Sequence, residues 1–252
     1  TEFLELQNLS RRAVNLRGAR FSQGIEYMFP DNRDTLLGPG QRLVLVSDLF
    51  HFQKRYGLDV PVAGIFAGNL SNVGERLTFE TAARTVICTF HYDVANPWPA
   101  GADGGGYTLV LAHPQLGFHN PAAWRTSAST NATPGRTDAT VFSGQPTADM
   151  DGDGLLALLE YALGTSDTDN SSGPGALAWS FDRQGGLALH FPRNLRADDV
   201  LLRAEFSGDL VRWTPATLIA TQPFGDGVAM ETWSVPGSVE SILFLRLSVT
   251  RP

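Results

Sequence analysis

The stretch DMDGDGLLALLEYALG, residues 149–164, determines how the rest of the chain is organised. Its first half places three acids at alternate positions with glycines among them, and its second half has the leucine spacing of a short helix that Gly164 can end. The chain on both sides instead holds short apolar runs divided by Gly, Pro and Asn, as strands and turns do. The sequence therefore predicts a linker with one helix between two strand-rich domains.

The predicted domains are residues 1–136, a linker at 137–173, and residues 174–252. Strand-like runs lie at residues 2–7, 13–22, 41–47, 75–80, 85–92 and 107–113, and again at 187–191, 201–206, 216–220, 229–235 and 242–250. The exception is a short helix within residues 47–57, where Ser47 or Asp48 can cap the start and Gly57 can end it. We expect an all-β chain of two β-sandwiches whose linker carries half of an EF-hand.

The acidic stretch fits the calcium-loop pattern D-x-D-x-[DN]-G-x5-E from the first acid to the last. Calcium prefers six to eight oxygen ligands, and carboxylates crowded this closely repel one another unless a cation lies among them. In this pattern Gly154 allows the sharp turn. The predicted ligands are the side chains of Asp149, Asp151 and Asp153, the backbone carbonyl of Leu155, and both carboxylate oxygens of Glu160.

A solvated acidic linker followed by an unrelated helix is the alternative, but it leaves the ordered spacing unexplained. A full EF-hand would also have a helix before the loop, and Gly144 and Pro146 break any helical pattern there. Asp167 or Asp169 can fold back to add a ligand. Neither matches a fixed template, so surface solubility is the simpler role for both.

Composition and motifs exclude several classes of function. The net charge of −7 disfavours a nucleic-acid surface, and no apolar run is long enough to cross a bilayer. The single cysteine, Cys88, lies among apolar residues and is expected to be inert. The chain has none of the common hydrolase or phosphate-loop motifs, and its histidines are scattered. His91 and Asp93 can share a strand face, but without a third ligand an ordinary polar surface is favoured. We expect no enzymatic activity.

Residues 2–135 resemble the lamin tail domain family. The similarity is carried, in order, by EFLELQN, AVNLRGARFS, LLGPGQRLVLV, GIFAGNLSNVGERLTF, PWPAGADGGGYTLVL and WRTSASTNATPG. The resemblance implies an immunoglobulin-like β-sandwich that acts in recognition or as a scaffold. The acidic loop is similar to the half-hand calcium loops of dockerins and thrombospondin type 3 repeats. The segment AEFSGDLVRWTPA, with ILFLRLSVT further on, resembles C-terminal β-modules of secreted bacterial proteins.

Together these features predict a non-catalytic adhesion or scaffold module, extracellular or at the cell surface, with calcium fixing the linker. Its partner would be an unknown protein or polysaccharide, and a signal peptide is presumed missing from this fragment. The alternative is a carbohydrate-binding accessory region of a larger secreted enzyme, because five tryptophans are available to stack on sugars. Two or more coplanar, solvent-facing rings would favour that alternative.

Overall fold

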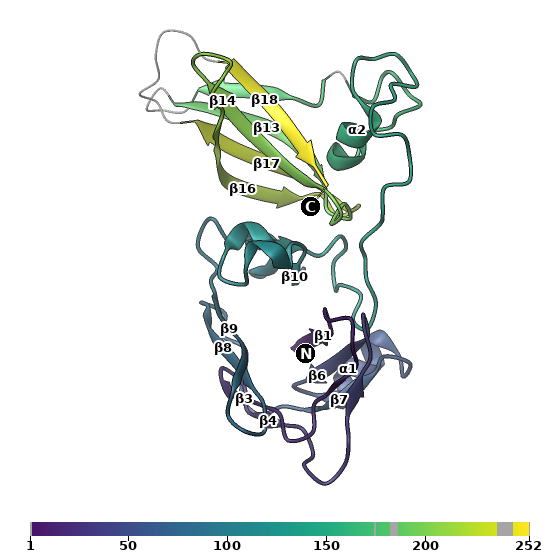
Figure 1. Ribbon diagram of the computed structural model, residues 1–252, viewed down its shortest axis with the longest axis vertical. Coiled ribbons are helices and arrows are strands. Elements are labelled where there is room, and N and C mark those ends of the chain that lie inside the picture. The colour runs from purple at the N-terminus through teal and green to yellow at the C-terminus, as the bar shows by residue number, and fades with distance from the viewer. Residues whose placement is uncertain (1, 174, 182–185, 236–243, 252) are drawn as a thin grey trace. The chain divides into compact units, whose positions relative to one another are not determined.

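The computed structural model describes residues 2–173, 175–181, 186–235 and 244–251 (Figure 1). Strands hold 37% of the residues and helices 10%, and the strands form several sheets, so the predicted all-β, sandwich-like class is confirmed. By their contacts the residues group into two units. Unit 1 is Thr1–Val94, Leu116–Pro121 and Thr133–Thr137, and unit 2 is Ala95–Gln115, Ala122–Ala132 and Asp138–Pro252.

Unit 1 contains one α-helix and nine strands among its described residues. They are β1 (Phe3–Gln7), β2 (Val14–Asn15), β3 (Arg20–Gln23), β4 (Tyr27–Met28), β5 (Leu36–Leu37), β6 (Arg42–Val46), α1 (Leu49–Tyr56), β7 (Val62–Ile65), β8 (Glu75–Glu80) and β9 (Val86–Tyr92). The sheets have the strand orders β1-β6-β7, β2-β5 and β4-β3-β8-β9. The β6–β7 pair is parallel, and the other strand pairs are antiparallel.

Strand β6 is the centre of unit 1 because both of its faces are buried. Leu45 points into a core that also holds Phe21 of β3 and Phe79 of β8. Val44 and Val46 alternate to the opposite face and pack with Phe52 of α1. An unbroken apolar run is typical of a strand covered on both sides. The helix ends as predicted, since the Asp48 carboxylate accepts a hydrogen bond from the His51 N–H (2.9 Å) and Gly57 has φ +86°.

Unit 2 contains the remaining elements. They are η1 (Ala100–Ala102), β10 (Leu109–Leu111), β11 (Trp124–Thr126), α2 (Ala157–Leu163), β12 (Ala178–Phe181), β13 (Leu187–Asn194), β14 (Leu201–Ser207), β15 (Thr214–Pro215), β16 (Thr217–Pro223), β17 (Val228–Val235) and β18 (Phe244–Thr250). Two further 3-10 turns, η2 (Pro114–Leu116) and η3 (Pro121–Ala123), each contain residues that group with both units. Two sheets, β12-β13-β17-β16 and β15-β14-β18, form the C-terminal sandwich, and β10-β11 form a separate pair.

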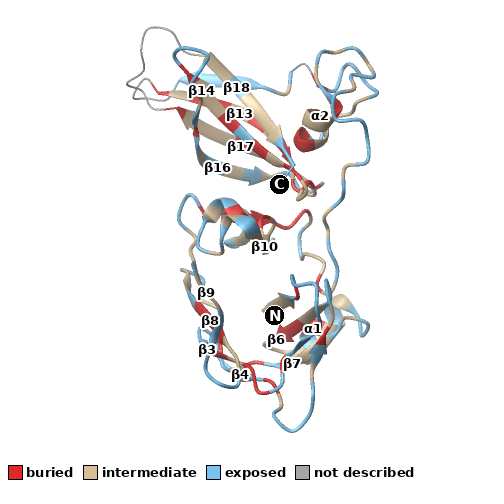
Figure 2. Ribbon diagram, in the orientation of Figure 1, coloured by how far each residue is buried: buried red, intermediate tan, exposed pale blue. Residues whose placement is uncertain are grey.

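Helix α2 belongs to the core of this sandwich. Ala162 and Leu163 pack in the same cluster as Phe191 of β13 and Leu202 of β14, with Leu155, Leu158 and Leu159 partly buried against it. Figure 2 shows buried residues on α2 and along the strands of the C-terminal sandwich. Gly164 ends the helix in the left-handed conformation, at φ +82°. The predicted helix is confirmed, although it begins at Ala157 rather than at the first leucine of the run.

The predicted strand runs all contain strands, and the structure adds β4, β5, β7, β11, β12 and β15. Ile242 and Leu243, at the start of the last predicted run, lie outside the described residues, as does Pro174, where the predicted third domain begins. Residues 95–115 and 122–132, part of the predicted first domain, group with the C-terminal sandwich by their contacts. Ala128, for example, shares a small buried cluster with Leu195 and Ala229.

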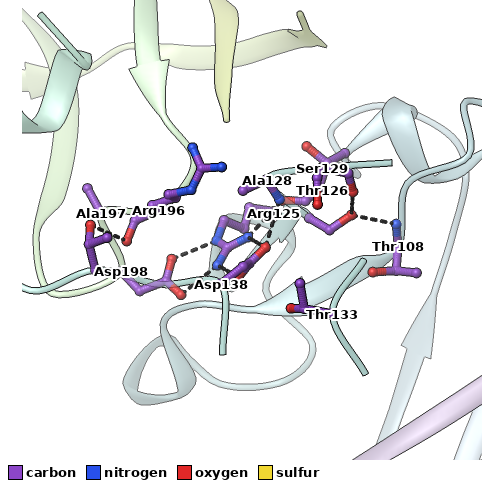
Figure 3. Close-up of polar contacts among 12 residues, drawn as sticks. Thr108, Arg125, Thr126, Ala128, Ser129, Thr133, Asp138, Arg196, Ala197 and Asp198 are labelled. Atoms are coloured by element: carbon purple, nitrogen blue, oxygen red, sulfur yellow. Dashed lines mark hydrogen bonds and ion pairs between the residues drawn. The ribbon is translucent and has the colours of Figure 1, made fainter. Parts of the chain in front are cut away.

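A buried arginine joins three segments of unit 2 that are far apart in the sequence (Figure 3). Arg125 of β11, only 9% exposed, donates to both carboxylate oxygens of Asp198, at 2.6 and 2.8 Å. It also donates to both oxygens of Asp138, at 2.6 and 3.3 Å, and to the Thr126 carbonyl. The Ala128 N–H completes the cluster with a hydrogen bond to Asp138 (2.7 Å). The planar guanidinium is suited to this paired geometry.

Burial opposes the ionisation of Asp138, yet the hydrogen bonds and charge of Arg125 outweigh it and lower the pKa of this carboxyl. Asp138 is therefore charged, and Arg125 is the cation that compensates it. Replacing the arginine alone would leave two carboxylates without a cation.

We expect Arg125→Met to lower the free energy of unfolding of unit 2 by about 3–5 kcal/mol, the usual effect of removing one partner of a buried ion pair. The control is Arg17→Met, because the Arg17–Asp34 pair is more than half exposed on both sides. That change should cost less than about 1 kcal/mol. Urea unfolding followed by circular dichroism, which reports on the strands of both units, measures both variants. Equal small losses of stability in the two variants would contradict this role of Arg125.

A buried histidine lies in the same region. His113, after β10, is 4% exposed, and its Nδ1 has no hydrogen-bond partner among the described residues. Burial lowers the pKa of His113 to about 4, helped by the positive charges of Arg193, Arg125 and Arg203 and opposed by Asp198. The imidazole is therefore neutral in the folded protein at neutral pH.

This histidine should make unit 2 sensitive to acid. The unfolded chain takes up a proton at His113 below its ordinary pKa of 6.5, whereas the folded chain does not until about pH 4. Stability present above pH 6.5 is therefore lost as the pH falls toward 4, by up to roughly 3 kcal/mol. Urea unfolding of the wild type and of His113→Leu, each at pH 7 and pH 4.5, tests this. The variant should lose less stability between the two pH values than the wild type does. If the variant loses as much stability as the wild type, other titratable groups cause the pH dependence.

Candidate metal centre

The acidic loop is a closed turn whose two ends are held together by backbone hydrogen bonds. The Ala157 N–H donates to the Ala148 carbonyl (2.8 Å), and the Leu158 N–H donates to the Pro146 carbonyl (3.3 Å). Residues 137–148, all of them described, contain no helix, so one helix flanks the loop as predicted for a half-hand. The turn returns the chain directly to the start of α2.

The three aspartates of the loop converge. Each of Asp149, Asp151 and Asp153 offers a carboxylate oxygen, and these oxygens all lie within 4.8 Å of one another. Backbone N–H groups hold each side chain inward. Asp149 accepts from Gly152 (2.9 Å) and Gly154 (3.2 Å), Asp151 from the N–H of Asp153 (3.2 Å), and Asp153 from Leu155 (2.7 Å).

The curl of the loop depends on glycine at two places. Gly152 and Gly154 have φ +75° and φ +93°, in the left-handed region that side-chain-bearing residues rarely adopt. No atom lies within 4 Å of where a Cβ would stand on either glycine. Backbone conformation rather than lack of space therefore requires glycine here, as the sequence predicts for Gly154.

Glu160 supplies a buried carboxylate on α2. The residue is only 1% exposed. Its Oε1 accepts a hydrogen bond from the Thr165 hydroxyl (3.3 Å), while its Oε2 has no partner among the described residues. The Oδ2 atoms of Asp151 and Asp153 are likewise buried without a partner. A buried carboxylate oxygen that accepts no hydrogen bond is costly, and oxygens of this kind are the ligands that a hard cation prefers.

The electrostatics agree with this geometry. Burial raises the pKa of Glu160, and the negative charges of Asp151, Asp153 and Asp167 raise it further, against the hydrogen bond from Thr165. The carboxylates of the loop therefore repel the carboxylate of Glu160 on α2. A divalent cation among them would reverse this repulsion.

Of the predicted ligands, the structure gathers Asp149, Asp151 and Asp153 into one group. The carboxylate of Glu160 is not within the 4.8 Å spacing of that group, but its charge interacts with two of the three. The N–H of Leu155 donates to Asp153, and the role of the Leu155 carbonyl stays a prediction. Sequence reasoning missed Gly173, a buried residue on which a Cβ would stand 2.3 Å from Asp153 Oδ2.

Other candidate groups give weaker sites. Burial raises the pKa of Cys88, which keeps the thiol protonated. Trp179 is the exposed residue among the five tryptophans, at 65%, beside Phe181 on β12. The two rings meet edge to face, with an interplanar angle of 80°. They do not form the coplanar platform that would favour a sugar site.

No protein-family model, curated protein or solved structure matches this chain. The resemblances to the lamin tail domain family, to dockerin-like and thrombospondin type 3 loops and to secreted C-terminal modules therefore stay predictions. Within the described residues, no helix has the length and apolar character needed to cross a membrane.

Proposed function

We propose that this chain is a non-catalytic adhesion or scaffold module, extracellular or at the cell surface, in which a structural calcium ion rigidifies the linker before the C-terminal sandwich. The observation that carries the proposal is the set of buried, unpartnered oxygens on Asp151, Asp153 and Glu160 beside the converging aspartates. Without these buried oxygens, the spacing of the acids would also be compatible with a solvated acidic linker that binds no metal.

The donor atoms favour calcium over the transition metals. The group of potential ligands in the described residues consists of carboxylates, without histidine or cysteine, and hard oxygen donors suit calcium and magnesium. A flexible loop that can accept a bidentate glutamate suits the larger ion better. Extracellular calcium modules commonly bind at about 10⁻⁴–10⁻³ M, so such a site fills outside the cell.

The position of α2 explains what the ion would do. Glu160 shares the helix with Ala162 and Leu163, which are fixed in the core of the C-terminal sandwich. An ion held by the loop and by Glu160 would therefore connect the linker to that core. Because the metal binds the folded arrangement, its binding free energy would add to folding stability.

Each unit has a surface hollow among its described residues. One in unit 2, beside Trp98 and β16, has a volume of about 100 Å³. A larger one in unit 1, of about 380 Å³, is lined by Leu36, Leu37, Gly40, Gln41, Arg42, Leu43, Pro61 and Gly135. Small-molecule sites usually enclose about 300–1,000 Å³ with convergent polar groups. The charged residue that lines the larger hollow is Arg42, and its guanidinium is already paired with the carboxylate of Glu5 (2.8 Å). A protein or polysaccharide partner on an open surface fits these features better.

Calcium titration by calorimetry on the chelator-stripped chain tests the site. We expect about one equivalent to bind and the midpoint of thermal unfolding to rise, with a gain near 1.4 kcal/mol when calcium is about tenfold above Kd. Asp151→Asn and Glu160→Gln should lose most of this binding and of the thermal shift. In chelator both variants should be at least as stable as the wild type, because a neutral amide relieves repulsion among the acids.

The control is Asp59→Asn, which removes one exposed negative charge in unit 1. It should leave calcium binding unchanged. Wild-type affinity in both Asp151→Asn and Glu160→Gln would show that the ligands are wrongly assigned, and no binding by the wild type would contradict the proposed function itself.

A further inference from the structure

Strand β12 lies at one edge of the four-stranded sheet in the C-terminal sandwich. It pairs with β13 on one side, and no strand among the described residues pairs with its other side. All four of its residues are exposed. The backbone groups along this outer side are therefore available to hydrogen-bond with another strand.

The exposed rings of β12 continue the core-facing side of the sheet. Trp179 lies opposite Leu189 of β13, and Phe181 lies opposite Leu187. Both leucines belong to the core of the sandwich, and residues directly opposite one another in a sheet point to the same face. Yet Trp179 is 65% and Phe181 67% exposed, so nothing among the described residues covers this part of the face. Leu177, two residues before Trp179, is also exposed. We name Leu177, Trp179 and Phe181 the β12 strip.

The other edges of the sandwich carry features that block strand pairing. At the opposite edge of the same sheet, β16 has a bulge between Leu218 and Ala220, ends at Pro223, and has η1 beside it. In the second sheet, β15 has two residues, one of them a proline, and β18 bears Arg246. Natural sheets protect their edges with such bulges, prolines, charges and short strands. By contrast, residues 175–181 contain no charge and no proline, and β12 pairs with β13 without a bulge.

We propose that β12 pairs, antiparallel, with β12 of a second copy of this chain. With the two-fold axis at Trp179, each Trp179 lies opposite the same residue of the other copy, and each Leu177 lies opposite Phe181. These side chains then share one face and form apolar cross-strand pairs. A two-fold pairing uses the same surface in both copies, and it closes at two copies because β16, the other edge of the sheet, is blocked.

The charge of the edge favours a second copy as the occupant. Residues 175–181 are uncharged, so two copies meet there without like charges opposite one another. A charged peptide strand would find no counter-charge along these residues. The proposal does not depend on the calcium site, and it extends the proposed scaffold role by supplying a contact between copies.

The area of the strip predicts a weak dimer. A covered aromatic side chain buries about 150–250 Å², so the exposed parts of Trp179 and Phe181 in two copies offer roughly 400–700 Å². Stable interfaces bury about 1,200–2,000 Å² in total. Leu177 and the paired backbones add to the smaller figure without reaching that range. The dimer should therefore form at high protein concentration and dissociate on dilution.

Sedimentation of the full chain between micromolar and millimolar concentration tests the proposal. Physiological ionic strength screens the repulsion between copies, each with a net charge of −7, and a chelator prevents calcium from bridging two acidic loops. We expect the average mass to rise from that of a monomer towards that of a dimer and to stop there. A wild type that stays monomeric at millimolar concentration would overturn the proposal.

Two variants that add the same charge locate the contact. Trp179→Lys places two lysines opposite each other at the two-fold axis and should weaken the dimer about tenfold or more. Val211→Lys, at a residue that is 80% exposed in the turn after β14, should leave dimerisation within about twofold of the wild type. Equal effects of the two substitutions would contradict pairing through β12. Circular dichroism checks that both variants fold.

Amide hydrogen exchange locates the contact in the wild type itself, whether or not Trp179→Lys folds. Raising the protein concentration should slow exchange in residues 177–181 and leave β16 unchanged. A dimer in which residues 177–181 exchange as fast as in the monomer would place the contact elsewhere and overturn the proposal. Calcium binding is measured separately, so failure here leaves the proposed calcium site standing.

Discussion

A carboxylate withdrawn from water needs a cation or several hydrogen-bond donors, and unit 2 contains two clusters of such carboxylates. Asp138 and Asp198 share the guanidinium of Arg125, which reaches four of their oxygens. Asp151, Asp153 and Glu160 have no ion pair with a lysine or arginine among the described residues, and each keeps one buried oxygen without a partner. The same requirement thus explains both the internal arginine of one cluster and the proposed external ion of the other.

The two clusters stabilise different connections within unit 2. The Arg125 cluster joins β11 to the residue that begins the linker and to the turn after β13, so segments 73 residues apart are held by one side chain. The acidic loop acts locally, within the linker, where it joins residues 146–148 to the start of α2. Because Arg125 is part of the chain, the first connection does not depend on the solution, whereas under the proposed function the second would depend on the calcium concentration around the protein.

Features that depend on residues close together in the sequence were predictable. Helix α1 follows from its cap residues, α2 from its leucine spacing and Gly164, and the loop from an ordered template of acids and glycines. Strand β12 was missed because its four residues are all exposed and give no alternating pattern. The partners of Arg125 were also missed, since nothing near an arginine in the sequence indicates which distant acids will meet it.

The placement of Glu160 shows how the metal site and the core constrain each other. Ala157 and Leu163 precede and follow it by three residues, so all three lie on one face of α2, and all three are buried. A charged residue on the buried face of a short helix would ordinarily oppose docking of that helix, by several kcal/mol when the charge is uncompensated. Under the proposed function, a cation at the loop would remove that opposition, because it would provide a counter-charge at the one point where the face is polar. Packing of α2 on the C-terminal sandwich and binding of the ion would then favour each other, since each stabilises the helix position that the other requires.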